Sequence, residues 1–160
     1  PHVFGAEKYS TAEEVVSQWE ERKKEEGKKR GSVLEGVPKA MPSLLRAHRL
    51  QDRAARVGFD WESVTDAFLK LEEEFVEFKE AVKGANRDEI EDELGDMFFM
   101  LVNISRFTGV NPEDALRRTL SKFISRFGYI EMKAEETGTR LKDMTLEEMD
   151  RLWEEAKRKE

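Results

Sequence analysis

Two pairs of carboxylates are spaced so that they could meet on adjacent helices. Glu74 and Glu77 are three residues apart, and so are Glu93 and Asp96. Residues three apart lie on one face of an α-helix, where like charges repel each other unless a cation lies between them. Carboxylate oxygens are the ligands that Mg²⁺ and Mn²⁺ prefer. The four acids therefore favour a divalent metal site, which could in turn bind a polyphosphate.

Other metal chemistry has little support in the sequence. The chain contains no cysteine and only two histidines, His2 and His48. Thiolate sites are excluded, zinc is disfavoured, and the Glu-x-x-His motif of di-iron bundles is missing. A simpler explanation stays open, because the chain holds 35 acidic residues. From spacing alone, these carboxylates could equally form a structural network with basic residues such as Arg126.

The elements that would position the acids are helices. Apolar residues recur every three or four positions in 61–83, which predicts a helix capped by Asp60, with a buried stripe of Val64, Phe68, Leu71, Phe75, Phe78 and Val82. A second helix is predicted over 87–108, with Asn86 as its cap. Its central part is apolar on nearly every side, so we expect it to be buried all round. We therefore expect Asp96 to be at least partly buried too.

An antiparallel hairpin of these two helices would align the acids. Glu77 and Glu93 lie at nearly equal sequence distances from the connection at 84–87, and so do Glu74 and Asp96. Each pairing is offset by about one residue, which is roughly 1.5 Å along a helix axis. We therefore predict that the four carboxylates converge at two adjacent levels of the hairpin.

Three further helices complete the predicted fold. One covers 44–57, and Gly58 ends it. Another starts at Asn111 and Pro112, which form a cap followed by a proline in the first turn, and it ends near residue 138. The last helix starts at a capping box at 145–148. Strand-like alternation is nearly absent, so the expected fold class is all-α, a bundle of antiparallel helices.

Composition limits the choice of partner and compartment. The 160 residues carry a net charge of −7, with an isoelectric point of about 5.2. An acidic chain repels the phosphates of nucleic acid, which is therefore not expected as a partner. The sequence shows no apolar run of the length that spans a membrane and no signal peptide, so we expect a cytoplasmic protein. Because the chain begins with Pro1 rather than methionine, we expect it to be a fragment.

A wider pattern surrounds the acids. Residues 70–81, KLEEEFVEFKEA, and 91–109, EDELGDMFFMLVNISRFTG, contain E-E-x-x-E, a 15-residue spacer and E-x-x-D. This order resembles the MazG family of nucleoside triphosphate pyrophosphohydrolases. The flanking segments resemble the same family over roughly 36–160, namely LLRAHRLQDRAARVGFDW, LSKFISRF and MDRLWEEAKRKE.

The resemblance implies an activity and an organisation. Family members hydrolyse nucleoside triphosphates to the monophosphate and pyrophosphate with Mg²⁺, for which Mn²⁺ could substitute, and this would serve house-cleaning of the nucleotide pool. Their fold is a helical bundle completed by dimerisation, so a homodimer is expected. The initial PHVF resembles the end of the first of two tandem domains. Residues 1–36 would then be the end of a preceding domain and a charged linker, and 37–160 the catalytic helical domain.

The resemblance also implies a role for each acid. It makes metal ligands of Glu74, Glu77, Glu93 and Asp96. It gives Glu73 the role of supporting the site or orienting the attacking water, so that Glu73 and Glu74 form the catalytic pair.

Five further residues are candidates for substrate binding. By resemblance, Lys70 lies near the substrate, Lys122 and Arg126 hold phosphate, and Trp153 lies near the nucleotide. Each has a structural alternative, because Lys122 and Arg126 could be solvated on one helix face and Trp153 could seal the core. Asn103, a polar residue in an apolar helix, either contacts substrate or satisfies backbone groups.

Two alternative functions stay open. One is a specialised dUTP or dCTP pyrophosphatase, since the sequence does not give the preferred base or sugar. The other is a non-catalytic helical module for dimerisation or nucleotide binding. The complete set of five acids favours the enzyme.

Overall fold

The computed structural model describes residues 31–160, and the secondary structure in this range is entirely helical. The all-α prediction is therefore confirmed for these residues. The predicted end of a preceding domain lies outside them, as does most of the predicted linker. The elements are α2 (Ser43–Ala55), α3 (Val64–Gly84), α4 (Arg87–Phe107), α5 (Pro112–Glu136), the 3-10 turn η1 (Leu141–Asp143) and α6 (Leu146–Lys157).

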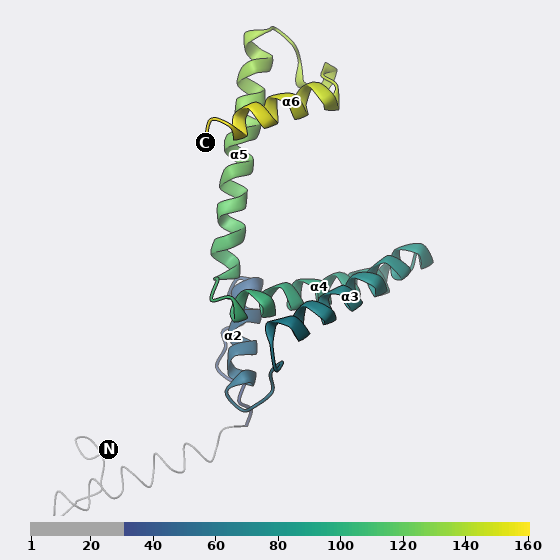
Figure 1. The fold of residues 1–160 in the computed structure, drawn as a ribbon, viewed down its shortest axis with the longest axis vertical. Helices are drawn as coiled ribbons and strands as arrows, with labels where there is room; N and C mark the ends of the chain where they lie inside the picture. The colour runs from purple at the N-terminus through teal and green to yellow at the C-terminus, as the bar shows by residue number, and fades with distance from the viewer. Residues whose placement is uncertain (1–30) are drawn as a thin grey trace, which may run out of the picture.

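The helices form two groups joined by α5 (Figure 1). Helices α3 and α4 pack side by side as an antiparallel hairpin, and α2 packs against α4. Helix α5 starts beside this group and leads away from it. Helix α6 then folds back against the distant half of α5, which places the two groups at opposite ends of the molecule.

Most helix ends follow the local sequence. Helices α2, α4 and α5 begin and end within two residues of the predicted positions. The Asn86 side chain accepts a hydrogen bond from the Asp88 amide, and the Asn111 side chain accepts from the two amides that follow Pro112. At the start of α6, Thr145 and Glu148 form the predicted capping box, in which each side chain accepts from the other residue's amide. These short-range contacts satisfy the amides that a helix start leaves unpaired.

The predicted start of α3 is wrong. Its cap is Ser63, whose hydroxyl accepts from the Asp66 amide, and not Asp60. The Asp60 carboxylate accepts from the Trp61 amide at 2.9 Å and pairs with Arg106 of α4. The ion pair with a distant helix therefore draws Asp60 out of the capping role.

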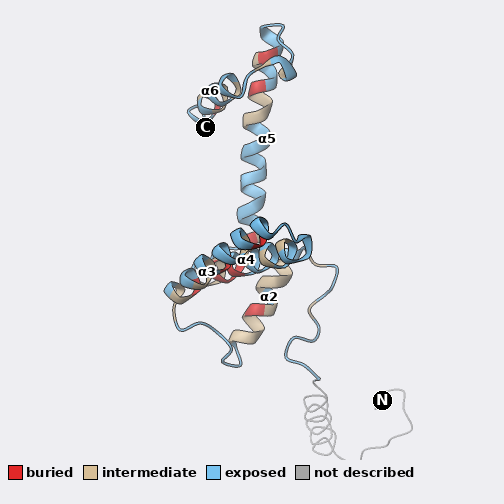
Figure 2. Ribbon diagram, turned by 90° about the vertical axis from the view of Figure 1, so that its right-hand side faces the viewer, coloured by how far each residue is buried: buried red, intermediate tan, exposed pale blue. Residues whose placement is uncertain are grey.

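The predicted buried stripe of α3 is also partly wrong. Fully buried positions on α3 recur every seven residues, at Ala67, Glu74 and Ala81, while Phe68 and Phe75 stay half-exposed. The buried positions at the α3–α4 contact are therefore small residues and one glutamate, and the two phenylalanines are not part of it; Figure 2 colours the buried positions red. The core at the base of the hairpin consists of Ala67, Met100 and Ile104, with Val64, Leu71 and Phe107 packed against them.

Large apolar side chains remain exposed on the single chain. Phe98 on α4 is 53% exposed, so the expectation that α4 is buried on nearly all sides is wrong for one copy. The middle of α5 is exposed as well (Figure 2), and Ile124 there is 71% exposed. Folded monomers rarely leave contiguous apolar surface of this kind uncovered. Residues 31–160 thus present apolar faces on α3, α4 and α5 that no other part of this range covers.

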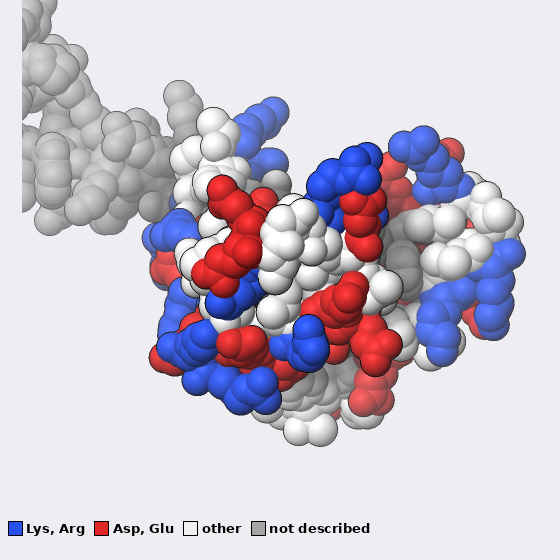
Figure 3. All heavy atoms as spheres, turned by 90° about the horizontal axis from the view of Figure 1, so that it is seen from above, with Lys and Arg blue, Asp and Glu red and all other residues white. Residues whose placement is uncertain are grey.

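Two surface properties bear on possible partners. None of the helices among residues 31–160 combines the length and apolar character that a membrane crossing requires. Acidic and basic side chains are mixed over the face shown in Figure 3. Nucleic-acid binding usually needs basic residues gathered in a patch or stripe, and this face has neither.

Candidate active site

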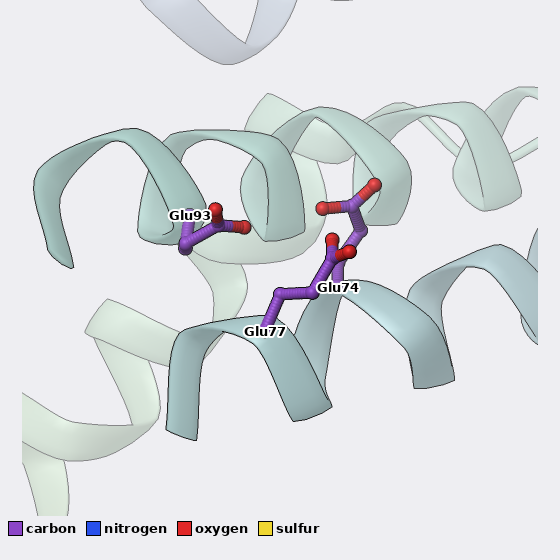
Figure 4. Close-up of side chains that lie close together, drawn as sticks. All are labelled: Glu74, Glu77 and Glu93. Carbon is purple, nitrogen blue, oxygen red and sulfur yellow. The ribbon is translucent and has the colours of Figure 1, made fainter. Parts of the chain in front are cut away.

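Three of the predicted metal ligands converge between α3 and α4. Glu74 and Glu77 project from α3 toward Glu93 of α4 (Figure 4), and one carboxylate oxygen from each lies within 4.8 Å of the other two. Glu74 is buried, Glu93 is half-buried and Glu77 is exposed. The cluster therefore opens to solvent on one side, where a substrate could reach it.

The electrostatics of the cluster suit a cation. The pKa of Glu93 is raised above its ordinary value, first by desolvation and then by the charges of Glu77, Glu74, Asp96 and Asp92. The causes that act on Glu93 within the described part of the chain include no nearby cation, so its ionised form is disfavoured. An all-oxygen donor set whose negative charge is only partly compensated fits a hard divalent ion such as Mg²⁺ or Mn²⁺.

Asp96 lies beside the cluster but is not one of its three members. It follows Glu93 by one helical turn, and its charge contributes to the raised pKa of Glu93. The expectation that Asp96 is partly buried is wrong, because its side chain is exposed in the single chain. Helix α2 reaches α4 near Phe99, where the Gln51 amide donates to the Phe99 carbonyl at 2.8 Å.

Lys70 already contacts two of the predicted catalytic acids. Its Nζ lies 2.9 Å from a carboxylate oxygen of Glu73 and 2.9 Å from one of Glu74. Hydrogen bonds to Glu73 and then to Glu74 raise the pKa of Lys70 above its ordinary value. The buried Glu74 carboxylate is thus neutralised by a lysine one turn earlier on the same helix.

A second group of predicted site residues lies on α5 and α6. Arg126 donates to the carboxylate of Glu160 from Nε at 3.1 Å and from Nη2 at 2.7 Å. The guanidinium also lies over the Trp153 ring, 5.4 Å from its centroid, and this ring packs against Phe123 at 5.4 Å between centroids. Trp153 therefore seals the α5–α6 contact and supports Arg126 at the same time.

Glu160 is a residue that the sequence analysis missed. Hydrogen bonds from Arg126 are the first cause of its lowered pKa, and the charges of Arg126 and Lys122 lower it further. Its carboxylate thus lies close to both members of the predicted phosphate-binding pair. A forked guanidinium contact of this kind suits carboxylate and phosphate alike, because both present two oxygens. Sequence pattern could not reveal it, since Glu160 is 34 residues from Arg126 among many other charged residues.

The two groups are not brought together in one chain. Figures 1 and 2 agree that α6 and the distant half of α5 are far from the α3–α4 hairpin. Asn103 belongs to neither group. It is buried on α4, and its side-chain oxygen accepts from Arg106 at 3.3 Å, where Arg106 also pairs with Asp60. This network fixes Asn103 against the segment that precedes α3.

Comparison with known proteins shows that the similarity to MazG proteins covers most of the chain. Residues 58–130 match the model of the MazG nucleotide pyrophosphohydrolase domain. A Thermotoga maritima protein named nucleoside triphosphate pyrophosphohydrolase/pyrophosphatase MazG is 42% identical over 159 residues, which are 98% of this chain and 59% of that protein. An Escherichia coli K12 protein named nucleoside triphosphate pyrophosphohydrolase is 35% identical over 164 residues, covering 100% of this chain and 62% of that protein.

The chain thus spans about three fifths of the length of these two relatives. The Bacillus subtilis protein YabN, which is uncharacterized, is 46% identical over 162 residues, and these cover 33% of its length. The matched segment 58–130 contains all five acids of the E-E-x-x-E and E-x-x-D pattern, together with Lys70, Lys122 and Arg126. Residues 58–130 of this chain thus carry a MazG nucleotide pyrophosphohydrolase domain.

Proposed function

We propose that this chain is a Mg²⁺-dependent nucleoside triphosphate pyrophosphohydrolase, with residues 37–160 as its catalytic domain. The observation that carries the proposal is the convergence of Glu74, Glu77 and Glu93 within 4.8 Å between α3 and α4, which lie in the segment that matches the family model. The products are a nucleoside monophosphate and pyrophosphate. Such an activity would remove unwanted nucleotides from the cytoplasmic pool.

The acids divide the work of holding a cation and a water. Glu74, Glu77 and Glu93 would hold the ion. Asp96, one helical turn further along α4, would extend the site. When bound, Mg²⁺ neutralises triphosphate oxygens and supports attack by water. Glu73 precedes Glu74 in the sequence, and the two carboxylates share the Lys70 ammonium, so we propose that Glu73 accepts the proton of that water. Mn²⁺ meets the same donor preference and would substitute.

The basic residues bind the charge of the substrate. Lys122 and Arg126 are proposed to hold phosphate oxygens, and Trp153 supports the Arg126 guanidinium from one side. The contact between Arg126 and the Glu160 carboxylate supports this role, because it is a forked contact with an oxyanion. Asn103 and Lys70 are proposed to contact the substrate nearer to the acids.

A homodimer is proposed to complete the site. The α5–α6 contact, where Arg126 pairs with Glu160, lies away from the α3–α4 hairpin (Figure 1), and large apolar side chains of α3, α4 and α5 are exposed among residues 31–160. A second copy packed on these faces would bury them and bring Arg126 of one subunit toward the acids of the other. The proposal therefore joins two features that the single chain leaves unexplained.

Product identification tests the activity. ATP and dTTP are incubated with protein and Mg²⁺, and the products are separated by anion-exchange chromatography. We expect a monophosphate and pyrophosphate, and orthophosphate as the released product would contradict the proposal. Nucleotide binding without turnover would instead support a non-catalytic module. A panel of ribo- and deoxynucleotides, including dUTP and dCTP, separates a broad from a specialised enzyme.

A matched pair of variants links the activity to the site. Glu74→Gln removes a buried ligand and is expected to lower kcat at least a hundredfold. Glu131→Gln makes the same change at an exposed position on α5, away from the cluster, and should leave kcat unchanged. Equal activity in both variants would remove Glu74 from the site.

A further inference from the structure

The Glu74 carboxylate has two possible interactions that compete with each other. Its carboxylate is bound by the Lys70 ammonium at 2.9 Å, and it is also the buried member of the cluster formed with Glu77 and Glu93. The Lys70 side chain is 30% exposed, so its ammonium is near the solvent boundary and has room to move. Glu74 thus has an internal cation on one side and a place for an external cation on the other.

A divalent ion at the cluster would weaken the contact between Lys70 and Glu74. Two positive charges a few ångströms apart repel each other more strongly beside the protein than in bulk water, because the effective dielectric constant is lower there. The ion would also withdraw negative charge from the Glu74 carboxylate. Lys70 keeps an alternative partner, because its Nζ is 2.9 Å from Glu73 as well. The lysine stem is long and flexible, so the ammonium can leave Glu74 without a change in the helix.

We propose that Lys70 is the internal counter-ion of the metal-free site, that a divalent cation displaces its ammonium from Glu74, and that the freed ammonium then binds the triphosphate. The first two steps concern metal binding alone. The last step rests on the proposed function. In this scheme the metal does more than hold the substrate, because its arrival releases a cation for the phosphates. Metal binding and nucleotide binding then strengthen each other.

The role in metal binding is tested without nucleotide. Lys70→Met removes the ammonium and keeps a flexible side chain of similar length, and Mn²⁺ binding is followed by electron paramagnetic resonance of the free ion. We expect the Kd for Mn²⁺ to fall about five- to tenfold, because the ion no longer competes with a charge-assisted contact. An unchanged or higher Kd would overturn the counter-ion role.

A control separates this contact from a general change in charge. Lys83→Met removes the same charge from the same helix, but Lys83 pairs with Glu80 at 2.6 Å and does not touch Glu74. Salt at about 0.15 M screens exposed charges beyond roughly 8 Å, so we expect less than a twofold change in Kd. An equal effect in both variants would overturn the proposal. Circular dichroism verifies folding, and Lys70→Gln replaces Lys70→Met if the latter does not fold.

The release step is tested with a non-hydrolysable triphosphate in saturating Mn²⁺. Lys70→Met should bind it about five- to tenfold more weakly than the wild type, although it binds the metal more tightly. Unchanged affinity for the triphosphate would overturn the release step. A wild type with no turnover but with the expected Mn²⁺ response would contradict the proposed function and leave the counter-ion role supported. The two failures are therefore distinguishable.

Discussion

At the scale of single residues, the site is a set of charges that lack full compensation. Glu74 is neutralised by Lys70, but Glu93 faces four other carboxylates, and its pKa is raised. On the other side of the molecule, Arg126 is neutralised by Glu160. Glu74 and Arg126 are thus paired internally, and the ionised form of Glu93 is held at an energetic cost. Both situations favour exchange with a charged ligand.

The raised pKa of Glu93 predicts how stability depends on pH. The folded state binds more protons than the unfolded state above the ordinary glutamate value of 4.5. The contribution of Glu93 to the unfolding free energy therefore falls as pH rises from that value through the raised pKa. Urea unfolding should show the wild type losing stability relative to Glu93→Gln over this window. Mg²⁺ should remove the difference, and parallel pH profiles without Mg²⁺ would contradict the assignment.

The pairing of Arg126 with Glu160 predicts that anions compete for Arg126. Glu160→Gln removes the internal anion and should bind inorganic pyrophosphate about two- to fivefold more tightly, as measured by calorimetry. Glu154→Gln is the control. The charge of Glu154 also raises the pKa of Arg126, but its carboxylate pairs with Lys157 at 3.4 Å. An identical gain in both variants would show that only net charge matters.

At the scale of elements, the sequence predicted what short-range contacts determine. Asn86, Asn111 and the Thr145 capping box start their helices as expected, because each cap binds amides within three residues. The start of α3 was missed because Asp60 is held by Arg106, which is 46 residues away. A pattern read along the chain cannot rank two candidate caps when a distant ion pair decides between them.

The capping box predicts a measurable contribution of Thr145 to the stability of α6. Thr145→Ala should lower the unfolding free energy by about 1 kcal/mol. Hydrogen bonds from Thr145 lower the pKa of Glu148. The part of the stability that comes from the ionised Glu148 carboxylate is therefore present above the ordinary glutamate pKa and is lost as pH falls through the lowered value. Thermal unfolding of Thr145→Ala against Thr119→Ala, a helix-interior position on α5, tests this. Equal melting temperatures at neutral pH would contradict it.

The register of the α3–α4 hairpin was also predictable from the sequence. The burial of the α3 side chains was predictable only in part. Counting outward from the connection placed Glu77 beside Glu93 and Glu74 one level further, and these three acids do meet. The aromatic stripe of α3 was wrongly predicted to be buried. The spacing of apolar residues shows that a helix is amphipathic, but it does not show which of two adjacent faces packs against α4. Small residues such as Ala67 define the close helix contact, and Phe75 faces outward. The roles of the site residues themselves stay predictions.

At the scale of the whole molecule, the single chain separates its predicted site residues and leaves large apolar side chains exposed. The α3–α4 hairpin and α6 lie at opposite ends of the described chain (Figures 1 and 2), and large apolar side chains on α3, α4 and α5 are exposed. The proposed homodimer would account for both features. The sequence could not show this, because amphipathic periodicity marks a face for burial without saying whether the partner is the same chain.

The homodimer predicts a mass and an interface. Light scattering should give twice 18.6 kDa for the wild type. Ile124→Glu places a charge on the exposed face of α5 and should yield a monomer, since burying an unpaired carboxylate is costly. Leu146→Glu is the control at a position that is 83% exposed on α6. A monomeric wild type, or an Ile124→Glu variant that remains dimeric, would contradict this interface.

The central claim is that Glu74, Glu77 and Glu93 hold a divalent cation, and Mn²⁺ titration of the purified protein tests it most directly. The account predicts saturable binding by the wild type and by Glu131→Gln. It predicts at least a tenfold loss of affinity in Glu74→Gln and in Glu93→Gln. Absence of saturable binding, or equal affinity in all four proteins, would contradict the claim.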